Sequence, residues 1–315
     1  MNGTAYLDTF ANDNLPPREQ WPELLFELPE LAYPERLNCA CELLDAMVAR
    51  GHGGSVAIRG ANLTWTYAEL LETVDRIAGV LRADLALVPG NRVLLRGANN
   101  PMMAACILAV WKAGCVAVPT MPLLRAKELA TIMGLAKVNA VLCAADLRAE
   151  LDLACEGSDS APRIVSFNDS APGSLEERMA SMPPRFEAVD TWAQDVCLLS
   201  FTSGTTGRPK GTMHFHRDVL AICDCFPRST LGATSGDVFI GTPPLAFTFG
   251  LGGLLLFPLR VGASTVLLEK LNPDSLLAAI AEYRATVCFT APTFYRQMAP
   301  LAARHDLSSL TRSVS

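Results

Sequence analysis

The sequence predicts an α/β fold in which helices cover a largely parallel sheet. Short apolar runs of strand length alternate with longer amphipathic runs of helix length through most of the 315 residues. Half of the residues are hydrophobic and the mean hydropathy is +0.25, which is too apolar for a disordered chain. A chain of this length can bury roughly three quarters of its unfolded surface, so we expect a full hydrophobic core.

The first elements follow a proline-rich stretch, residues 1–38, which we expect to form an extended arm. A helix is expected over 40–50 and a hairpin over 56–65. Thr66 and Glu69 have the spacing of a capping box, which predicts the start of a helix. Further on, we expect a strand at 92–95, a helix at 102–112, a strand at 115–118, a helix at 126–136 and a strand at 140–143.

The alternation lapses over residues 157–187, where Ser, Pro, Asp and Gly dominate, and this stretch is the best candidate for a linker. We therefore expect a first α/β subdomain over 39–187 and a second, incomplete one over 188–315. The second is expected to contain strands at 196–201, 238–240, 264–268 and 286–289, with helices from about 216 and at 251–257, 273–283 and 294–303. Residues 313–315 have the pattern of the start of another strand, so we expect the chain to be a fragment.

The charge balance argues against nucleic acid as a partner. The net charge is −6, and the five lysines are scattered rather than clustered into a basic stripe. The ten cysteines mostly lie in apolar runs, which predicts buried free thiols in a reducing compartment. Two C-x-C pairs lack a partner pair at zinc-finger spacing, so no metal ligand is assigned. The N-terminus has no signal-peptide pattern, and we expect a cytoplasmic protein.

The longest apolar stretch, Pro101 to Leu124, approaches the length of a membrane span. Lys112 interrupts it at the middle, and Pro119 and Pro122 break its second half. A helix followed by a buried strand explains this stretch better than one spanning helix, so we expect no membrane span.

The most informative run extends from Thr202 to Gly211 and reads Thr-Ser-Gly-Thr-Thr-Gly-Arg-Pro-Lys-Gly. It follows an apolar strand and precedes a helix. Glycines let backbone N–H groups approach phosphate oxygens closely, hydroxyls donate without bulk, and lysine supplies a mobile charge. By composition alone, an ordinary turn remains an equal alternative. The run is no Walker loop, because Pro209 stands where that motif needs glycine, and 250–255 lacks the last glycine of a dinucleotide fingerprint.

In the order of its residues this run closely resembles the signature loop of the adenylate-forming superfamily, which includes acyl-CoA synthetases, luciferases and peptide-synthetase adenylation domains. Asn99 to Pro119 resembles the helix and strand that precede this loop in the family. Pro243 to Gly252 resembles the family's aromatic motif, with Phe249 at the position beside the acyl pocket. By composition alone, a phenylalanine in this apolar stretch is more often a core residue.

The resemblance implies a fold of two parallel-rich α/β subdomains within the N-terminal domain of an adenylate-forming enzyme, truncated before the barrel and the C-terminal lid. The arm and the aromatic motif look most like aryl-acid CoA ligases of the benzoate and 2-aminobenzoate type. Thr290 to Tyr295 matches a stretch that lies near the acyl pocket in relatives. The substrate-binding residues that follow from the resemblance are Phe249, Gly250, Ala291, Pro292 and Thr293.

The resemblance also implies the reaction. An aromatic carboxylic acid attacks the α-phosphorus of ATP to give an acyl-AMP and pyrophosphate, and CoA then displaces AMP, with Mg²⁺ as cofactor. Lys210 is the expected catalytic residue. The expected nucleotide-binding residues are Thr202, Ser203, Gly204, Thr205, Thr206, Gly207 and Lys210.

Several alternatives stay open. The family's metal-binding glutamate, ribose-binding aspartate and lid lysine are not found before Ser315, so we expect this chain alone to be inactive. It could instead be a non-catalytic nucleotide-binding remnant, or part of an enzyme that loads a carrier protein rather than CoA. His214 and His216 could form a metal pair, but two exposed imidazoles at a helix start are the favoured interpretation. The oligomeric state and the preferred acid are not predicted.

Overall fold

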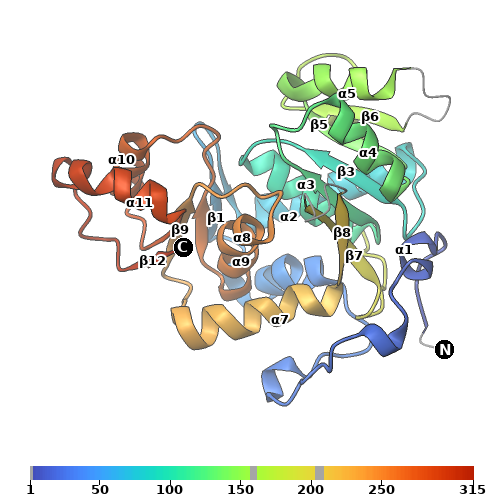
Figure 1. The fold of residues 1–315 in the computed structure, drawn as a ribbon, viewed down its shortest axis with the longest axis horizontal. Helices are drawn as coiled ribbons and strands as arrows, with labels where there is room; N and C mark the ends of the chain where they lie inside the picture. Colours follow the sequence, from blue (N-terminus) through green and yellow to red (C-terminus); the bar gives the residue numbers. More distant parts are fainter. Residues whose placement is uncertain (1–2, 157–161, 203–208) are drawn as a thin grey trace.

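The computed structural model describes residues 3–156, 162–202 and 209–315, and within them it shows two six-stranded sheets (Figure 1). In each sheet all neighbouring strands are parallel except one antiparallel hairpin at an edge. The first, here the β3 sheet, has the order β6 (Arg163–Phe167), β5 (Ala140–Ala144), β3 (Arg92–Arg96), β4 (Val116–Thr120), β7 (Val196–Thr202) and β8 (Lys210–Phe215). The second, the β9 sheet, has the order β12 (Arg312–Val314), β11 (Val287–Phe289), β9 (Val238–Gly241), β10 (Ser264–Val266), β1 (Val56–Arg59) and β2 (Thr64–Thr66). The predicted α/β class is confirmed.

The helices connect the parallel strands, as crossover connections in parallel sheets require. They are α1 (Phe10–Asp13), α2 (Tyr67–Gly79), α3 (Pro101–Lys112), α4 (Ala126–Ala136), α5 (Arg148–Cys155), α6 (Leu175–Ala180), α7 (His216–Phe226), α8 (Thr248–Leu251), α9 (Phe257–Val261), α10 (Pro273–Tyr283) and α11 (Pro292–Met298). Single turns of π-helix lie at Cys41–Asp45, Val48–His52, Val80–Asp84, Pro227–Leu231 and Gly252–Leu256, and 3₁₀ turns at Arg18–Gln20, Pro29–Leu31, Ala145–Leu147 and Ala299–Arg304.

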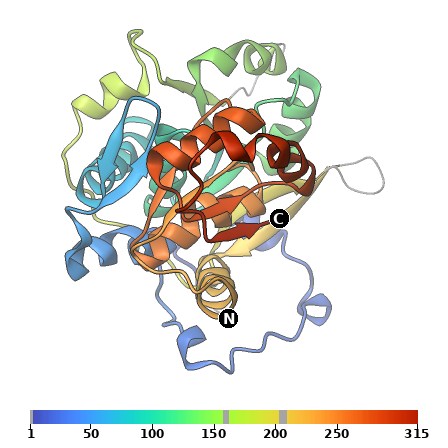
Figure 2. The same cartoon turned by 90° about the vertical axis from the view of Figure 1, so that its left-hand side faces the viewer.

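One large core joins the two sheets. Helices α2 and α3 lie between them (Figure 1), and the main cluster of buried side chains includes Ile77 of α2, Leu108 of α3, Leu95 of β3 and Phe289 of β11. Helix α3 is buried on nearly every side, as its uniformly apolar sequence requires. On the outer faces, α4 and α5 cover the β3 sheet, and α10 and α11 cover the β9 sheet (Figure 2).

Local signals account for several of these elements. The hydroxyl of Thr66 accepts a hydrogen bond from the Glu69 N–H, and the Glu69 carboxylate accepts from the Thr66 N–H, so the predicted capping box starts α2. The Pro101 to Leu124 stretch forms α3 and β4 as predicted. Lys112 at the end of α3 is buried between Asp45 and Asp75, with Nζ 2.6 and 2.5 Å from their carboxylates. Within the described residues, none of the helices combines the length and apolar character that crossing a membrane requires.

The sheets do not follow the predicted boundary at residues 187 and 188. Strands β1 and β2 precede that boundary but pair within the β9 sheet, and β7 and β8 follow it but pair within the β3 sheet. A linear division of the sequence misses this exchange because pairing between distant strands leaves no local pattern. The described parts of 157–187 also contain β6 and α6, so this stretch is more regular than a linker.

Candidate active site

The predicted phosphate-binding run starts and ends on the hairpin of β7 and β8. Thr202 is the last residue of β7 and pairs directly with Lys210, the first residue of β8. The prediction of a loop leading straight into a helix was therefore incomplete, because six residues of strand precede α7. Ser203, Gly204, Thr205, Thr206 and Gly207 lie outside the described residues. Lys210 and Thr202 are thus the two predicted phosphate ligands whose positions the structure gives.

Lys210 is exposed, and the described residues provide it with neither an ion pair nor a hydrogen bond. An exposed ammonium group that no described residue engages is suited to bind an incoming anion, because among these residues no existing contact must be broken first. Further along β8, Thr212 donates a hydrogen bond to the carbonyl of Ser200, which holds the two strands in register. The base of the hairpin is therefore fixed, while its charged residue faces solvent.

The other predicted site residues gather at the carboxyl ends of β9 and β11. These strands are parallel neighbours, with Gly241 opposite Phe289, so the segments that follow them start at the same edge of the sheet. The ring of Phe249 lies 5.6 Å from the ring of Phe289 and is 39% exposed. Ala291, Pro292 and Thr293 are exposed and form the start of α11. Ligands of open α/β sheets bind at such carboxyl edges.

Gly250 has a specific steric reason to be glycine. A Cβ at this position would lie 2.1 Å from the carbonyl oxygen of Pro244 and 2.5 Å from that of Pro243. The start of α8 can therefore pack directly onto the Pro243-Pro244 backbone only without a side chain. This contact fixes Phe249 at the edge of the β9 sheet.

Asn99, which was not predicted as a site residue, joins the carboxyl edges of the two sheets. Its side-chain nitrogen donates to the Pro243 carbonyl at 2.8 Å, and its oxygen accepts from the Leu245 N–H at 2.9 Å. Asn100 beside it donates to Glu269 at 2.8 Å and caps α3. Two asparagines before a proline are a sequence pattern typical of a helix start. That pattern does not indicate that Asn99 contacts Pro243 and Leu245.

A cavity of about 460 Å³ lies between the phosphate-binding hairpin and the aromatic motif. Of the predicted site residues that the structure describes, Thr202 alone lines it. It is lined by Thr202 and Pro209 on the phosphate-binding side and by Ala246 and Phe247 of the aromatic motif on the other. Pro119 and Thr120 at the end of β4, the adjacent Met121, and helix α4 complete its wall. Phe247 is 39% exposed and lines this cavity, whereas the sequence analysis selected only Phe249 from the same motif. The spacing of Phe247 and Phe249, two residues apart in the same motif, was the sequence pattern that could have identified Phe247.

The two histidines near the hairpin differ from the expectation of two exposed imidazoles. His216 is fully buried, and His214 on β8 is partly buried. Burial lowers the pKa of His214 below its ordinary value. His214 lies on β8, a strand that was not predicted, and His216 is the first residue of α7.

Comparison with known proteins identifies the family. A family profile described as AMP-binding enzyme matches residues 46–315. Benzoate–CoA ligase of Thauera aromatica is 29% identical over 271 residues, which are 86% of this chain and 51% of that protein. Anthranilate–CoA ligase of Pseudomonas aeruginosa is 31% identical over 235 residues, 73% of this chain and 44% of that protein. The chain thus spans about half the length of the curated relatives it matches.

Solved structures have the same fold. A benzoate CoA ligase from Burkholderia xenovorans LB400 is 26% identical with a TM-score of 0.78, and the match covers 88% of this chain and 54% of that one. The anthranilate CoA ligase AuaEII in complex with anthranoyl-AMP is 24% identical with a TM-score of 0.84, covering 90% and 55%. The predicted superfamily and its N-terminal α/β fold are confirmed, and this chain belongs to the family of AMP-binding enzymes.

Proposed function

We propose that this chain provides the ATP-binding and acid-binding parts of an AMP-forming ligase that activates an aromatic carboxylic acid and transfers it to CoA. The observation that carries the proposal is the single cavity reached both by Thr202 of the phosphate-binding hairpin and by Phe247 of the aromatic motif. An acid and a nucleotide that react with each other must meet in one such space. Relatives named as benzoate and anthranilate CoA ligases support the aromatic class.

The first proposed step is attack of a carboxylate oxygen on the α-phosphorus of ATP. The bond between the α-phosphorus and its bridging oxygen breaks, and pyrophosphate leaves. In the second step the CoA sulfur attacks the acyl carbon, the thiol gives up its proton, and AMP leaves. Mg²⁺ is proposed to bind as a complex with the ATP phosphates and to neutralise part of their charge. Phosphoryl transfer of this kind depends mainly on positioning and charge stabilisation by the protein.

The chain's own groups are assigned to these tasks by position. Lys210 is proposed to bind the leaving phosphates, since it is exposed at the start of β8. Thr202, the last residue of β7, pairs with it. The Phe249 ring is proposed to form a wall of the acid site, together with Gly250 and the start of α11 at Ala291, Pro292 and Thr293. These residues share one sheet edge, so an aromatic acid there would lie flat against apolar surface.

The test replaces Lys210 in a version of the protein that contains all parts of the family's fold. We expect Lys210→Ala to slow acid-dependent exchange of pyrophosphate into ATP by about 10²–10³-fold, because a preorganised charged donor is lost. Lys127→Ala is the matched control, since Lys127 is an exposed lysine on α4 outside the proposed contacts. An unchanged exchange rate in Lys210→Ala would contradict the assigned role.

The same assay on the 315-residue chain distinguishes the alternatives. We expect the chain to bind ATP but to show no exchange with benzoate or 2-aminobenzoate. Rapid exchange would refute the expectation that this chain is inactive alone, and failure to bind ATP would remove the nucleotide-binding assignment. With the longer version, transfer to a carrier protein instead of CoA would replace the proposed acceptor and leave the adenylation step unchanged.

A further inference from the structure

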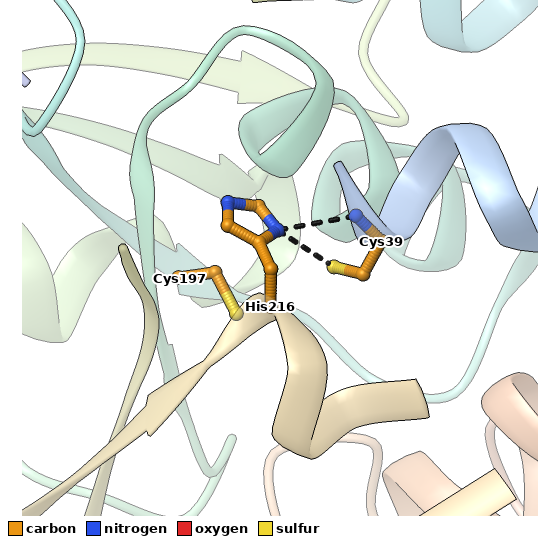
Figure 3. Close-up of side chains that lie close together, drawn as sticks. All are labelled: Cys39, Cys197 and His216. Carbon is orange, nitrogen blue, oxygen red and sulfur yellow. Dashed lines mark hydrogen bonds between the residues drawn. The ribbon is translucent and has the colours of Figure 1, made fainter. Parts of the chain in front are cut away.

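Two cysteines and a histidine from three distant parts of the chain converge beneath the β7–β8 hairpin (Figure 3). Cys39 begins the helical segment after the N-terminal arm, Cys197 lies in β7, and His216 is the first residue of α7. All three side chains are fully buried, and their potential ligand atoms lie within 4.8 Å of one another. This cluster takes no part in the proposed reaction.

A local irregularity accompanies the convergence. The pairing of β7 with β8 shifts register between Val196 and Leu198, which makes Cys197 the extra residue of a bulge. A bulge redirects a side chain that regular alternation would place elsewhere, and bulges often occur beside functional sites. The Cys197 Sγ donates a weak hydrogen bond to the His214 carbonyl at 3.5 Å. The bulge therefore lies at the same place as the cluster.

The contacts of His216 fix the side of the ring that faces the sulfurs. Its Nδ1 accepts a hydrogen bond from the Cys39 N–H at 3.2 Å and lies 3.1 Å from the Cys39 Sγ. Figure 3 shows Nδ1 on the side of Cys39, with Nε2 on the opposite side of the ring. A neutral imidazole in this position can bind a metal ion through a ring nitrogen.

This set of donor atoms suits a thiophilic cation. Two thiolates and one neutral imidazole are ligands that zinc prefers, and with a divalent ion their charges cancel, which favours burial in an apolar core. Ligand atoms on a tetrahedral zinc lie about 3.5–3.8 Å apart, given Zn–S near 2.3 Å and Zn–N near 2.0 Å. The Cys39 Sγ and the His216 Nδ1, now 3.1 Å apart, would separate by about 0.4 Å, and the other pairs, all within 4.8 Å, would approach by about 1.3 Å at most.

We propose that Cys39, Cys197 and His216 form a zinc site that ties the start of the first helical segment to the base of the phosphate-binding hairpin. Binding forms two Zn–S bonds and one Zn–N bond and releases the two thiol protons to solvent. The Cys39 N–H loses its acceptor at Nδ1 when the ion binds. A water or the nearby carbonyl of His214 takes the fourth tetrahedral position. The proposal is independent of the ligase reaction.

The experiment measures zinc in the reduced 315-residue chain, purified without chelator and then exposed to a small excess of zinc before desalting. We expect about one equivalent per chain by elemental analysis. X-ray absorption at the zinc edge should show about two sulfur ligands near 2.3 Å with the remainder nitrogen or oxygen. A metal content near zero, or a first shell without sulfur, would overturn the proposal, and neither measurement on the unaltered chain depends on a variant that folds.

Variants identify the ligands. Cys39→Ser and Cys197→Ser should each reduce the bound zinc at least about tenfold, since loss of a ligand weakens a three-residue site strongly. Cys106→Ser is the matched control, because Cys106 is equally buried in the same core but lies on α3 outside the cluster. Circular dichroism shows whether each variant is folded. Full zinc content in both folded cluster variants, or equal loss in the control, would assign the metal to another place and refute the site.

Discussion

The two halves of the candidate active site differ in how they are built. The β7–β8 hairpin pairs Thr202 with Lys210 and leaves both exposed, whereas the edge of the β9 sheet holds Phe249 through close backbone packing at Gly250 and side-chain hydrogen bonds from Asn99. The first half has an unmistakable sequence pattern, and the second has a weak one. A segment that binds phosphate through its backbone needs particular residue types in order, while a segment held by packing needs only a suitable shape from its neighbours.

The largest expected effect on stability contrasts one glycine from each half. Gly250→Ala should lower the free energy of unfolding by about 3 kcal/mol, because its Cβ would overlap backbone carbonyls that cannot move cheaply. Gly211→Ala on β8 should cost less than about 1 kcal/mol, since its Cβ would meet only the Phe201 ring at 3.1 Å. Urea unfolding of both variants gives the comparison. Equal effects would show that the two halves are packed alike.

The second test removes the link between the sheets. Asn99→Ala leaves the Pro243 carbonyl and the Leu245 N–H without partners in a buried place, which should cost about 2–3 kcal/mol. Asn272→Ala, which removes an exposed helix cap from α10, should cost about 1 kcal/mol and serves as the control. Thermal unfolding measures both changes. A loss for Asn99→Ala no greater than that for the control would mean that the edges are held together mainly by apolar contacts.

The same difference between local patterns and distant contacts explains which parts of the fold the sequence predicted. The alternation of apolar runs predicted most helices and strands, and the capping box at Thr66 predicted the start of α2. Strand β8 was missed because Gly211 and Thr212 continue the composition of the preceding run, although Met213 and Phe215 alternate as a strand requires. The exchange of hairpins between sheets and the link through Asn99 were missed because they depend on contacts between distant residues, such as the pairing of Ala117 with Leu198.

The next prediction concerns pH and the edge strand β12. Burial alone would raise the pKa of Asp237, but the Thr234 N–H, the Thr286 hydroxyl and the Arg312 guanidinium outweigh it and hold the pKa below its ordinary value. The carboxylate therefore stabilises the fold fully above the ordinary pKa of about 4, and this contribution is lost as pH falls through the lowered value. Asp237→Asn should lose about 2 kcal/mol at neutral pH.

The difference between the wild type and Asp237→Asn should shrink when unfolding is measured below about pH 4. Asp306→Asn is a useful comparison, because Asp306 pairs with Arg284 at an exposed position where solvent screens the charges. We expect that variant to leave stability nearly unchanged. A difference for Asp237→Asn that stays constant down to low pH would show that the carboxylate's charge contributes nothing at this strand.

Of the tested positions other than the controls, Phe249 is expected to contribute least to stability. Its ring is 39% exposed, so Phe249→Ala should cost about 1 kcal/mol, whereas Phe289→Ala, which removes a buried ring, should cost about 3–5 kcal/mol. If Phe249 forms a wall of the acid site, its removal should instead raise the KM for an aromatic acid about tenfold and leave the KM for ATP nearly unchanged. Phe249→Leu keeps the apolar volume and separates the loss of the ring from the loss of packing. Unaltered acid preference and rate in the alanine variant would return Phe249 to a structural role, in which its ring packs against the Phe289 ring.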